Sequence, residues 1–297
     1  MNVQACDIAA TVRQRYNFSV DRFPLRGPDG LSTPWFGLFR SDTGQAVGGG
    51  SVTNRYEPHT TDDVIALVDA AGAAFDGVAS LKCGFSDGHF VIAEPTDRQR
   101  LRVFDDGRNG GDDVWPRLFI SAPYGGSGAF RASVGFYRDV CRNLSRMQSV
   151  SGVSVTIRHT SSLRQRMDEL IETFGGLRDA WGNMTQVIQQ MESRRVNMVE
   201  FLKAVYGEPD RDTGRGVTIH RNRTEAIFRR LTSERMRTGR GDMTTGWEVT
   251  AWEAYNAVQG YVQHDASRRG HPSDIDRIIL ASTDAAVRRA EELALAV

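Results

Sequence analysis

The sequence predicts an α+β protein in which an antiparallel sheet precedes a mostly helical C-terminal half. Short β-prone segments separated by turns fill the chain up to residue 160, and apolar residues at helical spacing follow. With 297 residues, 40% of them hydrophobic, the chain has enough apolar mass for one large core or two modest ones. We expect a sheet part over 1–160 and a helical part over 161–297, packed together as one continuous unit.

The first part is predicted to contain a helix, an early hairpin and a second helix. An amphipathic segment within residues 1–20 predicts the first helix, and a Pro/Gly-rich connection follows it. A Ser-Asp-Thr-Gly turn separates Trp35–Arg40 from Gln45–Thr53, so these two β-prone segments are predicted to pair. The second helix is expected over Thr60–Phe75, because Thr60 is a suitable N-cap for the apolar periodicity that follows.

Further strands and helices follow in order along the chain. The predicted strands are Ala79–Phe85, His89–Ala93, Arg117–Ser121, Ala129–Tyr137 and Val153–Ile157. The Asp/Gly/Asn-rich segment 105–113 is predicted to be a loop. A long amphipathic helix is expected from Ser161 to Met191, with a weak point at Gly175 and Gly176. Further helices are expected near residues 194–206, 223–237 and 247–263.

Positive charge is concentrated in the middle of the chain. The whole sequence holds 37 basic and 37 acidic side chains, whereas residues 116–240 hold 21 basic and 12 acidic ones. Residues 131–166, here called the arginine band, contain seven arginines and one acidic residue, Asp139. A guanidinium forks onto phosphate oxygens and stacks on flat rings, so the band predicts contact with nucleic acid. A solvated or ion-paired surface is the alternative interpretation.

Arginines and aromatic residues alternate on the predicted strand Ala129–Tyr137. Successive strand residues point to opposite faces of a sheet. This rule places Arg131 and Tyr137 on one face, and Phe136 and Arg138 on the other. The glycine-rich segment before the strand could present backbone N–H groups to phosphate, but a flexible hairpin turn is the simpler and favoured explanation.

Motifs that support catalysis are absent from the sequence. It contains no G-x-x-x-x-G-K-[ST] phosphate loop and no H-E-x-x-H motif, and the adjacent aspartate pairs suit turns better than acid/base catalysis. Cys6, Cys83 and Cys141 are far apart and form no C-x-x-C pair, so neither a disulfide framework nor a zinc site is expected. We therefore expect no cofactor, no metal and no catalytic site. Without a long apolar run or a leader-like start, we expect a cytoplasmic protein without a membrane span.

Five ordered motifs resemble the phage/plasmid-like protein family of unknown function over about residues 35–268. They are Arg40-Ser41-Asp42-Thr43-Gly44, Arg55-Tyr56-Glu57-Pro58, Tyr137-Arg138-Asp139-Val140-Cys141-Arg142-Asn143-Leu144, Ile157-Arg158-His159-Thr160, and Thr250-Ala251-Trp252-Glu253-Ala254-Tyr255-Asn256-Ala257-Val258 with His264. Two positions depart from the family pattern: Thr60 or Thr61 stands in place of an amide residue, and Arg142 replaces a smaller one. The layout is also similar, at the level of the fold, to the Rad-type single-strand annealing recombinases that phages encode.

The resemblance and the arginine band together predict a phage or mobile-element protein that binds single-stranded DNA. It would promote annealing or recombination without nucleotide hydrolysis, because an arginine groove holds phosphates and leaves base edges free to pair. The candidate contacts are Arg55, Arg131, Arg138, Arg142, Arg158, Arg164 and Arg166 for phosphates and Tyr137 for stacking. One alternative is a structural or regulatory phage protein whose arginines form intersubunit ion pairs, and a less favoured one is a metal-dependent nuclease. The opposite charge blocks also predict a homo-oligomer, for which a closed ring is one arrangement.

Overall fold

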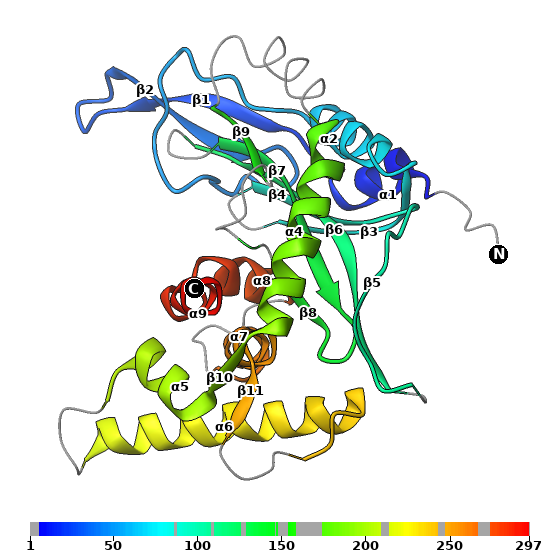
Figure 1. The fold of residues 1–297 in the computed structure, drawn as a ribbon. Coiled ribbons are helices and arrows are strands. Elements are labelled where there is room, and N and C mark those ends of the chain that lie inside the picture. The colour runs from blue at the N-terminus through cyan, green and yellow to red at the C-terminus, as the bar shows by residue number, and fades with distance from the viewer. Residues whose placement is uncertain are drawn as a thin grey trace. The chain divides into compact units, whose positions relative to one another are not determined.

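The computed structural model describes residues 6–85, 88–107, 110–125, 129–145, 147, 154–158, 174–208, 214–242, 247–266 and 274–296. The helices are α1 (Ile8–Arg15), α2 (Thr61–Ala73), α4 (Gly176–Ser193), α5 (Met198–Tyr206), α6 (Arg215–Thr238), α7 (Ala251–Gly260), the π-helix η1 (Tyr261–Asp265), α8 (Asp274–Thr283) and α9 (Ala285–Leu295). The strands are β1 (Val20–Arg26), β2 (Ser32–Arg40), β3 (Val78–Phe85), β4 (Gly88–Pro95), β5 (Leu101–Asp105), β6 (Gly111–Pro123), β7 (Ala129–Arg138), β8 (Asn143–Ser145), β9 (Ser154–Arg158), β10 (Arg195–Asn197) and β11 (Glu248–Thr250). The predicted α+β class is confirmed (Figure 1).

A seven-stranded sheet contains all the strands that the sequence predicts after the second helix. Its order is β3-β4-β6-β7-β8, with β5 also paired to β6 and β9 also paired to β7. The registers of the described pairs are antiparallel, and they place buried residues such as Val91 and Ile120 opposite one another. The predicted loop over 105–113 is shorter than expected, because β6 already begins at Gly111 and pairs with β5.

The early hairpin is built from different residues than the sequence predicts. β2 pairs with β1, which lies in the segment predicted to be a connection, while residues 45–53 reach β2 only through two isolated bridges. Pro24 favours a loop in a sequence-based prediction, yet β1 tolerates it. Phe36, the residue opposite Pro24 on β2, directs its backbone N–H and C=O to Val52 on its other side. The two residues are therefore a pair without hydrogen bonds between them, and the backbone nitrogen of Pro24 points away from β2. The missing N–H of Pro24 therefore costs no hydrogen bond between the two strands.

The predicted second helix is confirmed as α2, and its first turn explains where it begins. Thr60 accepts a hydrogen bond from the backbone N–H of Asp63, and the Asp63 carboxylate accepts one from the backbone N–H of Thr60. This capping box satisfies two N–H groups that a helix N-terminus otherwise leaves unpaired. The buried face of α2 carries Val64, Leu67, Val68 and Ala71, as the spacing predicts.

The C-terminal half contains more elements than expected. The predicted long helix is represented by α4 from Gly176 onward, and its predicted beginning, residues 161–173, lies outside the described residues. The short strands β8, β10 and β11 and the helices α8 and α9 are additional to the prediction. Among the described residues, no helix combines the length and apolar character needed to cross a bilayer.

The described chain forms two compact units, each assembled from three segments. The first comprises residues 1–98, 116–134 and 152–180, and the second comprises residues 99–115, 135–151 and 181–297. The units are thus interleaved along the sequence, rather than divided near residue 160. The long strands β6 and β7 each contribute one end to either unit.

The second unit has α7 at its centre. All ten residues of α7 are buried, and the helix contacts α6, α9 and β8. A helix buried all round must satisfy its polar side chains internally. Gln259 donates to the carbonyl oxygen of Leu144, and Asn256 donates to the carbonyl oxygen of Trp252.

The first unit buries two histidines that are hydrogen-bonded to each other. Nε2 of His59 and Nδ1 of His89 lie 2.8 Å apart, and neither residue is more than 2% exposed. The ring of Tyr124 stacks on His59 at 4.1 Å, and that of Tyr16 meets His89 edge-on at 4.2 Å. Burial, with a smaller contribution from the charge of Arg40, lowers the pKa of His89 to about 3. His89 is therefore neutral in the folded protein at physiological pH.

This pKa predicts that acid destabilises the first unit. Below its ordinary pKa of 6.5, His89 binds a proton in the unfolded chain, whereas the folded protein binds it only near pH 3. The free energy of unfolding should therefore fall as the pH decreases from 6.5 toward 3, by about 2 kcal/mol at about pH 5 from this group. Denaturant unfolding of the parent at pH 7 and pH 5 measures the loss.

The variant His89→Phe isolates this contribution. It should be less stable at pH 7, because His59 loses the hydrogen bond from or to His89, but its stability should fall less between pH 7 and pH 5. His220→Gln on α6 is the control for removal of a histidine outside the cluster. Equal pH dependence of the parent and His89→Phe would contradict the assignment.

Candidate nucleic-acid interface

The structure places the predicted arginines in different environments. Arg55 and Arg131 are exposed in the first unit, and Arg142 is exposed in the second. In the described part of the chain, none of these three forms an ion pair. Arg158 contributes its backbone to β9, and its side chain is not described. Outside the described residues lie Arg164 and Arg166.

Arg55 lies beside a shallow groove of mixed charge. The groove is lined by residues of β1 and of the segment before α2, among them Arg22 and the acidic residues Asp21 and Glu57. Arg22 is held in place by donating to the carbonyl oxygens of Asn54 and Tyr56, at 2.5 and 2.8 Å. Because two carboxylates share this groove with the arginines, it is less suited to a phosphate chain than a purely cationic surface.

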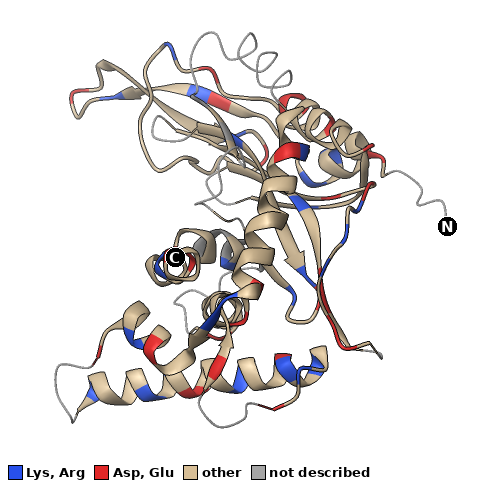
Figure 2. Cartoon of the chain, viewed as in Figure 1, with Lys and Arg blue, Asp and Glu red and all other residues tan. Residues whose placement is uncertain are grey.

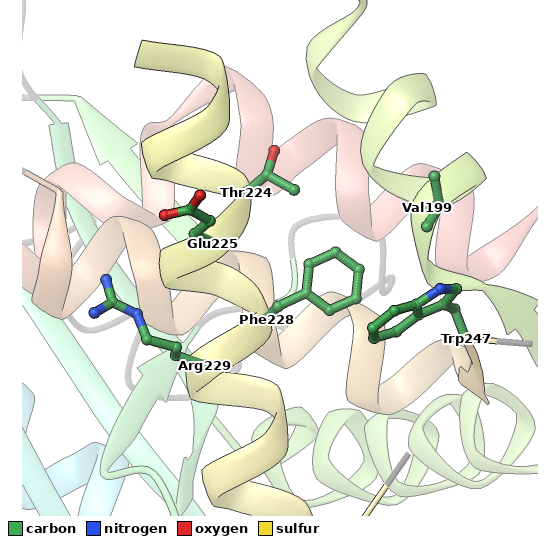
Figure 3. Close-up of a pocket in the computed structure, with 6 residues that line it drawn as sticks. All are labelled: Val199, Thr224, Glu225, Phe228, Arg229 and Trp247. Carbon is green, nitrogen blue, oxygen red and sulfur yellow. The ribbon is translucent and has the colours of Figure 1, made fainter. Parts of the chain in front are cut away.

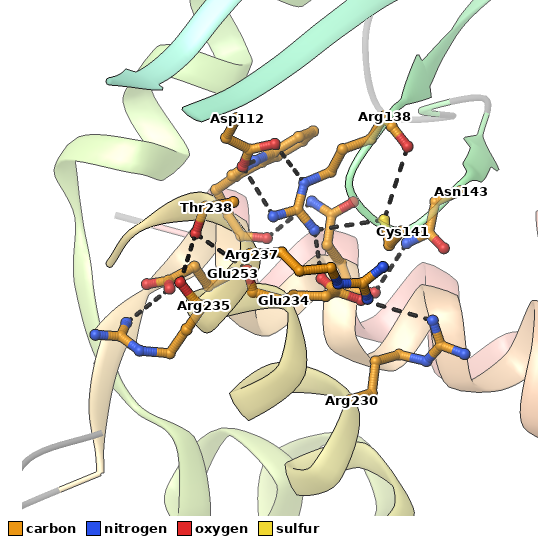
Figure 4. A network of polar contacts seen from close by, with 12 residues as sticks. Asp112, Arg138, Cys141, Asn143, Arg230, Glu234, Arg235, Arg237, Thr238 and Glu253 are labelled. Carbon is orange, nitrogen blue, oxygen red and sulfur yellow. Dashed lines mark hydrogen bonds and ion pairs between the residues drawn. The ribbon is translucent and has the colours of Figure 1, made fainter. Parts of the chain in front are cut away.

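Arg138, in contrast, is buried and cannot offer its guanidinium to a phosphate from this position. Its side chain is 1% exposed. It donates two hydrogen bonds of 2.8 Å to the Asp112 carboxylate and one of 2.5 Å to Glu234 (Figure 4). Strand alternation correctly puts Arg138 on the same face as Phe136, but this face is the buried one. A cation there must be paired, which corrects the predicted role of Arg138.

The pairing extends into a polar network that joins several elements of the second unit. Trp252 on α7 donates its indole N–H to Asp112 at 3.0 Å, and Arg230 on α6 lies 3.6 Å from the second oxygen of Glu234. Burial raises the pKa of Glu234, while the charge of Arg138 opposes the rise. Burial also raises the pKa of the Cys141 thiol to about 12, so this group is not a nucleophile at neutral pH.

Residues of two resemblance motifs meet next to this network. Asn143 donates to the backbone oxygen of Asn256 at 3.1 Å, and its side-chain oxygen lies 3.2 Å from Nε2 of His264. The hydroxyls of Ser145 and Tyr255 are 2.8 Å apart. These contacts are buried or partly buried, so the motif residues hold the second unit together.

Tyr137, the predicted stacking residue, lies on the less buried face of β7. Its ring is half-buried and tilted toward that of Trp115, with 6.3 Å between the centroids. Its hydroxyl lies 3.5 Å from the Asp139 carboxylate. One partly exposed aromatic pair therefore lies in the same unit as Arg142.

A second exposed set of arginines, which the sequence analysis did not single out, lies on α6. The helix contains seven arginines and two glutamates. Ile227, Leu231, Glu234 and Thr238 are buried and recur every three or four residues, which defines the inner face. The exposed arginines, here called the α6 arginines, are Arg215, Arg221, Arg229 and Arg237, and they follow the helix along its length (Figure 2). Within the described residues, the α6 arginines form no ion pairs.

Aromatic side chains form a shallow apolar groove beside the α6 arginines. The groove is lined by Val199, Thr224, Glu225, Phe228, Arg229 and Trp247. Phe228 and Trp247 point toward one another, with 4.9 Å between the ring centroids in an edge-to-face arrangement (Figure 3). Trp247 is 48% exposed, so much of its indole is open to solvent. Arg221 lies two helical turns from Phe228 on the same face of α6.

The backbone holds Trp247 in an unfavourable conformation. Its φ is +55°, in the left-handed region that bulky side chains rarely adopt. Its carbonyl oxygen accepts a hydrogen bond from the N–H of Met198, directly before β11 pairs with β10. A strained backbone that displays a large aromatic side chain to solvent is a feature of binding sites.

The sequence contains part of the signal for this site. Seven arginines over residues 215–237 form a denser cluster than the arginine band. The groove itself is not visible in the sequence, because Trp247 matches the periodicity of the helix predicted over 247–263, whereas it actually precedes β11. Trp247 also contacts Phe228 of another helix, and sequence periodicity does not reveal a contact between separate segments.

The network around Arg138 predicts a large loss of stability when this side chain is replaced. Arg138→Leu leaves the carboxylates of Asp112 and Glu234 buried without their cation, which should cost about 3–5 kcal/mol of the free energy of unfolding. Removing the cation also raises the pKa of Glu234 further. Protonation then relieves the buried charge, so the difference from the parent should narrow as the pH falls from 7 to 5.

Denaturant unfolding at both pH values measures this effect, with Arg142→Gly as the matched control. Arg142 is exposed and has a φ of +55°, where glycine is unstrained, so the control should be at least as stable as the parent. A loss for Arg138→Leu no greater than that for the control would show that the network is dispensable.

Comparisons with known proteins identify a family without an assigned activity. Neither the curated proteins nor the solved structures include a match to this chain. A family model described as a domain of unknown function (DUF932) matches residues 49–292. The matched region starts after the β1–β2 hairpin and contains both the Arg138 network and α6. Because this match covers most of the sequence, the chain belongs to the DUF932 family.

Proposed function

We propose that this protein binds single-stranded DNA along α6 and promotes the pairing of complementary strands without nucleotide hydrolysis. One observation carries the proposal: the four α6 arginines are exposed and form no ion pair with any residue that the structure describes, and the open indole of Trp247 lies beside them. Cationic side chains next to an aromatic surface are typical of proteins that bind single strands without sequence preference.

The dimensions of α6 suit a short stretch of a single strand. With 24 residues, the helix is about 36 Å long. The α6 arginines are distributed over almost all of this length, so several phosphates can be neutralised along one strand. Glu225 is the one acidic side chain on the exposed face of α6.

Trp247 and Phe228 supply a stacking surface whose chemistry is compatible with annealing. A base that stacks on an indole uses its π-face, and its hydrogen-bonding edge stays available to a complementary strand. Binding of this kind needs no catalytic acid, base or metal. The predicted contacts Arg131, Arg142 and Tyr137 are retained in the proposal as further contacts, and Arg138 is withdrawn because it is buried.

The wider setting belongs to the same proposal. The resemblance to the phage/plasmid-like family favours a role in a mobile genetic element, with a cytoplasmic location. Residues 1–115 hold five more acidic than basic side chains and residues 241–297 four more, whereas residues 116–240 hold nine more basic ones. These opposite charge blocks favour a homo-oligomer, with a ring as one arrangement.

Removing two α6 arginines should weaken binding in a salt-dependent way. If all four contact phosphates, they alone contribute about −3 to the slope of log affinity against log salt, or on the order of 50-fold between about 50 and 200 mM salt. Arg221→Gln with Arg229→Gln should make the slope less steep than the parent's by about 1.4. Fluorescence anisotropy with a labelled oligothymidine at both salt concentrations measures the slope.

A matched control comes from α9. Arg288→Gln with Arg289→Gln removes the same charge from exposed positions, and it should leave the salt slope as in the parent. A double variant of Arg131 and Arg142 tests the arginine band in the same assay. If both the α6 and band variants bind as the parent does, the arginines are a solvated surface and the structural role gains support.

Replacing Trp247 should separate stacking from electrostatics. Trp247→Gly should reduce the affinity for oligothymidine by about 1–3 kcal/mol, with the salt slope unchanged, because a base loses its stacking partner but no phosphate contact is lost. Glycine is unstrained at a φ of +55°, so backbone strain is relieved in this variant. Trp247→Phe should retain much of the affinity.

The annealing activity itself needs a separate measurement. Two complementary labelled strands should pair faster in the presence of the parent protein than alone, equally well with and without a chelator, and Trp247→Gly should slow this pairing. Strand cleavage that requires a divalent metal would instead favour the nuclease alternative.

A further inference from the structure

The β1–β2 hairpin carries large apolar side chains on both of its faces. On the inner face, Val20 and Leu38 are no more than 6% exposed, and Phe36 is bridged to Val52. On the outer face, Phe23 and Phe39 meet edge-to-face at 5.8 Å. A two-stranded ribbon in water normally keeps its outer face polar, so this arrangement requires an explanation.

The outer face is a flat apolar surface rather than a scatter of single side chains. A Cβ at position 37 would lie 2.7 Å from the Phe39 ring and 3.2 Å from Leu25, so Gly37 allows both side chains to lie across the strand. Trp35 belongs to the same face by alternation and is 47% exposed, and Phe23 is 53% exposed. Leu31, at the turn, is 68% exposed. The set Phe23, Leu25, Leu31, Trp35 and Phe39 is here called the hairpin face.

The hairpin face belongs to the first unit, whereas α6 and Trp247 belong to the second. Six large hydrophobic side chains of the described residues are exposed, and three of them, Phe23, Leu31 and Trp35, belong to the hairpin. The other three lie on α6 or at Trp247. Exposed apolar groups that gather in one place mark an interaction surface, whereas scattered ones do not.

The edge of the hairpin is unsuited to pairing with another strand. Position 24 faces away from β2, and Pro24 has no N–H to donate there. A partner that adds a strand at this edge would lose a hydrogen bond at the centre of β1. The surface available for association is therefore the flat face, against which another sheet face can pack.

The charges around the hairpin face indicate which partner fits it. Arg26 and Asp29, of opposite sign, are exposed at its turn end, and Asp21 is paired with Phe39 on the same face. Arg22 and Arg40 belong by register to the inner face, where Arg22 donates to the carbonyl oxygens of Asn54 and Tyr56 and Arg40 donates to Asp42. Without an excess of positive charge, this surround attracts neither nucleic acid nor an anionic membrane. A patch that carries both signs can be complementary to itself, because in a two-fold contact a pair between Arg26 of one copy and Asp29 of the other is formed twice.

We propose that the hairpin face is the contact through which two copies of this chain associate, face to face about a two-fold axis. The inference deepens the self-association part of the proposed function, and it rests on that part alone, not on DNA binding. The face contains five apolar side chains, well below the roughly 20–30 residues per side of a stable interface. Association through it should therefore be weak, with a dissociation constant on the order of micromolar.

Sedimentation velocity without nucleic acid tests the proposal, over protein concentrations from about 1 to about 100 µM. The parent should shift from monomer toward dimer or higher species across this range. Phe23→Thr with Trp35→Thr should shift the dissociation constant upward at least tenfold. Threonine suits a strand, and both positions are exposed, so the melting temperature should fall by only a few degrees through loss of the contact between Phe23 and Phe39.

Two further variants make the test specific. Ile219→Thr with Met236→Gln removes exposed apolar groups from α6 and should leave self-association unchanged. Arg26→Glu should weaken association by like-charge repulsion, and Arg26→Glu with Asp29→Arg should restore it, because the patch becomes complementary to itself again. A parent that stays monomeric throughout the range, or a hairpin variant that associates as the parent does, would overturn the proposal.

Oligonucleotide anisotropy with the hairpin variant distinguishes this proposal from the proposed function. If the hairpin variant is monomeric and still binds oligothymidine, both proposals are supported. If the parent associates through the hairpin but does not bind oligothymidine, the proposed function fails and the contact between copies remains.

Discussion

The second unit depends on one buried cation. The guanidinium of Arg138 lies between a carboxylate of β6 and a carboxylate of α6, and the indole of α7 completes the hydrogen bonding of Asp112. Three buried charges are tolerable in an apolar interior only together, because each one alone would carry a desolvation cost of several kcal/mol. The need to pair these charges therefore holds the start of β6, α6 and α7 in one arrangement. Apolar packing around α7 stabilises the same arrangement.

Helix α6, which supplies Glu234 to this network, has arginines in two different environments. On the side toward the network, Arg230 contacts Glu234 and Asp265, and Arg235 contacts Glu253. On the opposite side, the α6 arginines face solvent. The chain as a whole has no net charge, but the solvent-facing side of α6 is positively charged. The reason is that many of the carboxylates that balance the total charge are paired inside the second unit.

The sequence is informative where structure is local, and it fails where partners are distant. The α2 helix could be predicted because its cap and its apolar face lie within 13 residues. The strand face of Arg138 was also predictable from alternation. Its role was not, since its partners Asp112 and Glu234 are 26 and 96 residues away. A count of local charge cannot show whether an arginine is paired, and for this reason the arginine band and the α6 arginines are indistinguishable in the sequence. β1 was not predicted, because Pro24 argues against a strand unless it is known that its backbone nitrogen points away from β2.

The interleaving of the two units determines what can be done with pieces of this chain. A fragment that ends at residue 160 would contain most of the first unit but only two short stretches of the second, and the complementary fragment would lack β5, β8, Asp112 and Arg138. Neither piece would include a complete hydrophobic core together with its charge partners. Limited proteolysis between the units would therefore not release two independently stable domains, and the two units have to be produced together on one chain.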